Sequence, residues 1–139
     1  MKAQEITLSA REITESIFKF DQSRNGKAIV SCCANPFIDL GLGVNTGCGL
    51  LSTLAEVSLT AAGNTVLGNC VLKDMEIEML SEQQWDKLTA VAAILDTDGA
   101  LVTARCEITT SGNSKRKIQV ARAFATLARA KIPLERISR

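Results

Sequence analysis

The residues best placed to carry chemistry lie in one stretch, NTGCGLLSTLAEVS at positions 45–58. It begins with an Asn-Thr pair, continues with Gly-Cys-Gly at 47–49, and then enters an apolar helical pattern that Glu56 interrupts. A carboxylate in an otherwise apolar helix is costly unless it is exposed, paired or functional. The environment of Glu56 therefore decides whether this chain is an enzyme.

The chemistry that this stretch supports is attack on a carbonyl group. A helix start presents free backbone N–H groups and the positive end of the macrodipole. Glycines at 47 and 49 let a carbonyl oxygen approach those N–H groups closely, which makes an oxyanion hole. Glu56 is the carboxylate available as a general base or nucleophile, a role that burial of a carboxyl group favours.

Polar side chains accompany Glu56 at helical spacing. Ser52, Thr53 and Thr60 stand three or four residues away, so a polar track is predicted along one helix face. Either Ser52 or Thr60 could position a water molecule. The alternative is that these hydroxyls bond back to helix carbonyls.

The other candidates also have a structural alternative. Cys48 at a helix start has a lowered pKa if it is accessible; the alternative is a small core-filling thiol. Gly47 and Gly49 fit either an oxyanion hole or tight helix-sheet packing. Asn45 and Thr46 fit a turn and helix cap or a substrate contact. The basic run at 115–117 fits coenzyme A phosphates or a solvated surface.

Length and composition predict one globular domain spanning residues 1–139. Apolar residues make up 46% of the chain and charged residues 22%, which is typical of a packed globular protein. The net charge of +1 gives no field that would attract nucleic acid or an anionic membrane. The start of the sequence lacks the form of a signal peptide and no apolar run is long enough to span a bilayer, so we expect a cytoplasmic protein.

The histidine and cysteine content narrows the chemistry further. The chain has no histidine, which excludes Ser-His-Asp and Cys-His catalysis and Cys/His zinc sites. Its five cysteines include no C-x-x-C pair, so we expect reduced thiols that are mostly buried. We predict no metal and no cofactor.

The first half of the chain predicts two helices and a strand. Ser9 and Glu12 form a capping box for a helix over about 9–21, and a turn is expected at 23–26. A strand over 27–34 stops before Pro36, and a loop follows. The second helix is predicted over about 46–62, ended by Gly63 and almost wholly buried.

The second half predicts strands joined by short turns. Positions 66–79 alternate but change parity near Lys73, which indicates a β-bulge. Positions 88–95 predict a central strand covered on both faces, and a hairpin turn is expected at 96–99. Alternation continues over 101–109, a second turn is expected at 111–114, and 117–127 is predicted as a last strand. The result is an α+β fold with an antiparallel sheet wrapped around one central helix.

This order of elements resembles the hotdog fold of acyl-CoA thioesterases and their non-enzymatic relatives, over about 27–127. The central helix of phenylacetate-degradation-type thioesterases begins His-Gly-Gly and continues through Leu-Ala-Asp. Here Gly47 stands at the histidine position, Cys48 and Gly49 at the two glycines, and Leu54-Ala55-Glu56 on Leu-Ala-Asp.

The resemblance implies a site for an acyl-CoA or acyl-carrier-protein thioester at the interface of a homodimer or a dimer of dimers. It implies that Glu56 acts across that interface and that the Cys48 or Gly49 amide is the principal oxyanion donor. The candidate catalytic residues are therefore Glu56, Cys48 and Gly49, and the candidate substrate contacts are Asn45, Thr46, Gly47, Ser52, Thr53 and Thr60. The missing histidine keeps a second function open, that of a divergent hotdog protein that binds or senses the thioester without hydrolysing it.

Overall fold

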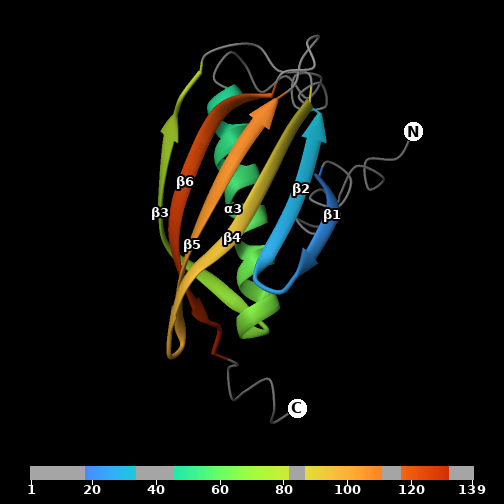
Figure 1. Ribbon diagram of the computed structural model, residues 1–139. Helices are drawn as coiled ribbons and strands as arrows, with labels where there is room; N and C mark the ends of the chain where they lie inside the picture. Colours follow the sequence, from blue (N-terminus) through green and yellow to red (C-terminus); the bar gives the residue numbers. More distant parts are fainter. Residues whose placement is uncertain (1–17, 34–45, 82–86, 111–116, 132–139) are drawn as a thin grey trace, which may run out of the picture.

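The computed structural model describes residues 18–33, 46–81, 87–110 and 117–131, which form one helix and six strands. The strands are β1 (Phe18–Arg24), β2 (Lys27–Cys33), β3 (Cys70–Met79), β4 (Lys87–Asp98), β5 (Leu101–Thr110) and β6 (Ile118–Arg129), and the helix is α3 (Thr46–Leu67). The strands form one antiparallel sheet in the order β1-β2-β4-β5-β6-β3. Figure 1 shows this sheet curving around α3, which confirms the predicted architecture.

Helix α3 is longer than the sequence pattern indicates. It ends at Leu67 because Gly68 adopts a φ of +84° and donates its N–H to the Asn64 carbonyl at 3.0 Å. The predicted end at Gly63 is therefore wrong. Gly63 lies inside the helix, where a Cβ would approach the Sγ of Cys70 to 2.8 Å, so this glycine lets β3 pass close to α3.

The core lies between α3 and the concave face of the sheet. From α3 the buried apolar side chains are Leu50, Leu51, Leu54, Ala55, Leu59, Ala62 and Leu67. Strand β5 buries alternate residues, as predicted: Val102, Ala104, Cys106 and Ile108. The stretch Gly49–Leu67 is long and apolar enough to cross a membrane by length and composition, but half of it is buried inside the protein, as in a core helix.

The four strands predicted in the second half of the chain are present in the structure as β3, β4, β5 and β6. The register of β3 against β6 shifts between Leu72 and Asp74, where the parity change indicated a bulge. Strand β4 lies between β2 and β5, but only its inner face is fully buried; Val91 and Ala93 on the other face are partly exposed in the protomer. The turn after β4 uses Gly99, with a φ of +63°.

Strand β6 forms despite the helix propensity of its alanines. It pairs with β5 on one side and with β3 on the other, so pairing and burial of one face outweigh local propensity. The predicted turn at 111–114 lies outside the described residues.

The predicted N-terminal helix is wrong at its C-terminal end. Residues 18–21 belong to β1, which pairs with β2 through a two-residue turn at Asn25 and Gly26, with φ of 55° and 76°. Positive φ at both turn residues is typical of a tight hairpin. Phe20 follows Ile13 and Ile17 at helical spacing but also alternates with Phe18 as in a strand, which explains the error. Residues 9–17 lie outside the described residues.

Candidate functional site

Helix α3 has a buried face and an open face, so the prediction of a nearly fully buried helix is wrong for the protomer. The sheet covers the face that carries the leucines. On the other side Thr53, Glu56 and Asn64 are exposed, while Ser52, Val57, Thr60 and Ala61 are partly exposed. The predicted polar track is therefore real, and it lies on the open face of α3.

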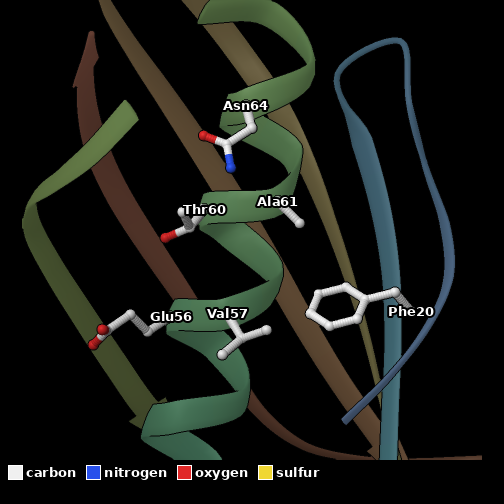
Figure 2. A pocket seen from close by; sticks show the side chains of 6 residues that line it. All are labelled: Phe20, Glu56, Val57, Thr60, Ala61 and Asn64. Carbon is white, nitrogen blue, oxygen red and sulfur yellow. The ribbon is translucent and has the colours of Figure 1, made fainter. Parts of the chain in front are cut away.

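A pocket of about 300 Å³ lies on this open face, between α3 and β1. It is lined by Phe20, Glu56, Val57, Thr60, Ala61 and Asn64. Figure 2 shows the Phe20 ring reaching from β1 toward Val57 and Ala61, while Glu56 and Thr60 project from the opposite flank of the helix. The pocket therefore has an apolar wall and a polar wall.

Glu56 is exposed, and within the described part of the chain it has no ion-pair or hydrogen-bond partner. Exposure alone removes the cost of placing a carboxylate in this helix. Glu56 is therefore not a buried charge, and it forms no salt bridge with another described residue. It is an exposed carboxylate at the rim of a pocket.

The predicted hydroxyl groups divide between two roles. The Thr53 hydroxyl donates to the Gly49 carbonyl at 2.8 Å, which is the helix back-bonding considered as the alternative. Thr60 lines the pocket beside Glu56, whereas Ser52 and Thr53 do not line it. The structure therefore brings Thr60, and not the other two, into the site around Glu56.

The start of α3 determines which amides are free. With Thr46 as the first helical residue, the N–H groups of Thr46, Gly47 and Cys48 precede the first intrahelical hydrogen bond. This favours the Cys48 amide over that of Gly49 as a donor. Asn45 and the side chains of Thr46 and Cys48 lie outside what the structure describes.

Gly49 has no packing role among the described residues. It is exposed, and a Cβ at this position would meet nothing within 4 Å. Helix-sheet packing therefore does not explain this glycine. Its effect is to leave the helix start open to approach from outside.

Glu56 and the helix start are too far apart to act together within one protomer. Seven residues at a rise of about 1.5 Å each separate Gly49 from Glu56 by about 10 Å along the axis. A base and an oxyanion donor must both lie within about 3 Å of the reacting groups. A single α3 helix can therefore supply either the base or the oxyanion donor to a given carbonyl, but not both.

No protein-family model matches the chain, and no curated protein matches it at a significant level. Solved structures do match it. A thioesterase family protein from Silicibacter pomeroyi aligns with a TM-score of 0.72 and 14% identity, over 84% of this chain and 87% of that one. The PaaI protein of the Escherichia coli phenylacetic acid degradation operon aligns with a TM-score of 0.71 and 17% identity, over 86% and 85%. The chain has the hotdog fold.

Another hotdog match is a hypothetical thioesterase from Streptococcus pneumoniae, solved with coenzyme A. It aligns with a TM-score of 0.65 and 17% identity, over 83% of this chain and 87% of that one. At these identities the likeness establishes the hotdog architecture. The activity of this chain must be argued from its own residues.

Burial disfavours the reactive thiolate form of Cys106 and, to a lesser extent, of the half-buried Cys70. The pKa of the Cys106 thiol is raised to about 11, mainly by burial. The hydrogen bond with Ser58 partly opposes this rise, and the negative charge of Glu107 adds to it. Burial also raises the pKa of Cys70. Among the described residues, no group of three or more His, Cys, Asp or Glu side chains could hold a metal ion.

Sequence reasoning missed four of the six pocket residues as site residues. Phe20 was assigned to a helix and Asn64 to a helix end, and Val57 and Ala61 were assigned to the core. The Asn25-Gly26 pair was a signal for a β1–β2 hairpin, which would have placed Phe20 on a strand. Nothing in the sequence alone indicated that this strand faces the open side of α3.

Proposed function

We propose that this chain is a thioesterase-like hotdog protein that binds and hydrolyses acyl-CoA thioesters between two copies of itself, in the cytoplasm. The observation that carries the proposal is the exposed Glu56 carboxylate that lines the pocket on the open face of α3. Structural neighbours that are named thioesterases, one of them solved with coenzyme A, support this choice of substrate.

In the proposed reaction Glu56 takes a proton from water, and the resulting hydroxide attacks the thioester carbonyl. The new oxyanion accepts a hydrogen bond from the Cys48 N–H at the start of an α3 helix. The oxyanion then re-forms the C=O double bond as the carbon–sulfur bond breaks, and coenzyme A leaves as a thiolate that takes the proton from Glu56. Thr60, beside Glu56, orients the attacking water.

A second copy supplies the missing half of each site. Glu56 of one copy and the helix start of the other act on the same carbonyl, because a single helix holds them about 10 Å apart. Strand β3 supports such an assembly, since it pairs only with β6 among the described strands and exposes Val71 and Met79. A long edge strand of this kind favours pairing with another chain. We propose a homodimer, alone or within a dimer of dimers.

The absence of histidine favours one alternative, a protein that binds or senses an acyl-CoA or acyl-carrier-protein thioester without hydrolysing it. Gly47 stands where the related thioesterases have a histidine. In that case an acyl-CoA raises the melting temperature and is recovered intact. Release of free thiol during the same incubation excludes this alternative.

The test of the proposed function is turnover of a panel of acyl-CoA esters by the wild type and Glu56→Gln. Loss of a general base lowers kcat by about 100-fold or more, and the exposed position of Glu56 keeps the fold intact. Glu76→Gln is the matched control, because Glu76 is also exposed but lies on β3 opposite Phe124, away from the pocket. Equal kcat values for Glu56→Gln and the wild type would remove Glu56 from the mechanism.

A further inference from the structure

We propose that the pocket between α3 and β1 holds the acyl group of the thioester and that Phe20 determines which acyl groups fit. This inference rests on the proposed function, because it identifies the part of the substrate bound at the same site. It assigns apolar acyl groups that fit a space of about 300 Å³ as the preferred class.

The two walls of the pocket give a ligand one orientation. Phe20, Val57 and Ala61 form the apolar wall, and Glu56, Thr60 and Asn64 form the polar wall. Figure 2 shows the Phe20 ring facing Val57 and Ala61, whereas Glu56 and Thr60 project from the flank of α3 away from Phe20. An acyl group laid across this face places its hydrocarbon against Phe20 and turns its carbonyl end toward Glu56.

Asn64 is oriented to serve the polar wall. Its Oδ1 accepts the N–H of Cys70 at 3.0 Å, so its amide nitrogen is left to donate. In Figure 2 that nitrogen points along the helix toward Thr60. The polar wall therefore combines a hydrogen-bond donor, a hydroxyl and a carboxylate, which suits the carbonyl end of a ligand.

The size of the pocket limits what it can hold. Its volume of about 300 Å³ is at the lower end of the range of about 300–1,000 Å³ for small-molecule sites. A whole coenzyme A thioester is too large for this space, whereas an acyl group is a suitable part of one. Phe20 occupies the side of the pocket opposite the helix, so its ring sets the room left for the acyl chain.

The position of Phe20 on β1 is well defined. It pairs with Val30 of β2, whose side chain is fully buried, and the register shifts between Phe20 and Gln22. Such a bulge changes the direction in which nearby side chains point. Phe18, two residues earlier on the same face, is 3% exposed, whereas Phe20 is 44% exposed. The difference arises because Phe20 faces the pocket.

The experiment measures kcat/KM and calorimetric affinity for straight-chain acyl-CoA esters of increasing length. Removing the ring in Phe20→Ala enlarges the pocket, so we expect the ratio of long-chain to short-chain kcat/KM, or of affinities, to rise by about 10-fold or more. Phe20→Leu, which retains most of the apolar surface, shows a smaller shift in the same direction. Phe124→Ala is the matched control, because Phe124 is also 44% exposed on a strand but stands opposite Arg105 and Glu76 on the outer face of the sheet.

The outcomes separate this inference from the proposed function. Hydrolysis with the same chain-length preference in wild type, Phe20→Ala and Phe20→Leu overturns the role of Phe20 and leaves the proposed function standing. A shifted preference in binding without any hydrolysis supports the acyl pocket and overturns the proposed catalysis. An equal shift in Phe124→Ala overturns the inference, and absence of binding to every ester overturns both proposals.

Discussion

The two faces of α3 differ in how their polar groups are satisfied. On the sheet side Ser58 is fully buried, and its hydroxyl donates to the Ala55 carbonyl at 3.0 Å and lies 3.2 Å from the Cys106 Sγ. On the open side Glu56 has no partner among the described residues. A buried polar group needs a partner within the fold, whereas an exposed carboxylate is satisfied by water. Glu56 is therefore a candidate because of its position at the rim of the pocket.

The same comparison separates the two exposed phenylalanines. Phe124 stands on the outer face of the sheet among charged side chains, of which Arg122 bonds Glu78 at 3.0 Å and Arg105 bonds Glu107 at 2.9 Å. Phe20 stands on the inner side, against the open face of α3. The two phenylalanines are therefore equally exposed but lie in different surroundings, and only Phe20 lines the pocket.

The largest expected effect lies on the buried face. Leu54→Ala removes a fully buried side chain and lowers the free energy of unfolding by about 2–5 kcal/mol. Val57→Ala, on the partly exposed face, lowers it by less than half as much, because less apolar surface leaves a packed environment. Urea unfolding of both variants measures the difference. Equal losses would show that something already covers the open face of α3.

A smaller effect concerns the pH dependence of the buried face. Burial raises the pKa of Cys106 from 9.0 to about 11. Between these pH values the unfolded chain loses the thiol proton and the folded chain keeps it, so stability falls as the pH rises through this window and is unaffected below it. The expected loss is on the order of 2–3 kcal/mol, at about 1.36 kcal/mol per pH unit.

The measurement is the urea midpoint of wild type and Cys106→Ala at several pH values between 8 and 11. Other groups titrate in the same range, so the informative quantity is the difference between the two pH slopes. A steeper decline in the wild type confirms the buried thiol. Parallel slopes would mean that water reaches Cys106 and that the sheet-facing side of α3 is less tightly packed than the structure shows.

Much of the fold could be predicted because period-two patterns persist in the strands. Alternation placed β5 and its buried residues, and a parity change located the bulge in β3. The errors occurred where a local pattern fits two structures. Phe20 suits a helical stripe with Ile13 and Ile17 or a strand with Phe18, and Gly63 suits a helix end or a close approach.

The site was less predictable than the fold. Glu56 and Thr60 were identified because a polar residue stands out in an apolar helix, and both line the pocket. Phe20 was missed because its role depends on β1 lying beside the open face of α3, which is a long-range contact. The extent of burial of α3 was overestimated because apolar composition does not show which face a curved sheet leaves uncovered.

The central claim is that Glu56 of one copy and the start of α3 in another make one site, and complementation between two inactive variants tests it most directly. Glu56→Gln removes the base. Gly49→Leu places a side chain over the open helix start, where a Cβ meets no described atom, and favours the helix by propensity.

Each variant expressed alone should be inactive toward acyl-CoA. When the two are coexpressed, random pairing forms mixed dimers in which one of the two sites is intact, so activity should return to about a quarter of the wild-type value. Activity that stays at the level of the separate variants, with mixed dimers shown to be present, would contradict a site built from two copies.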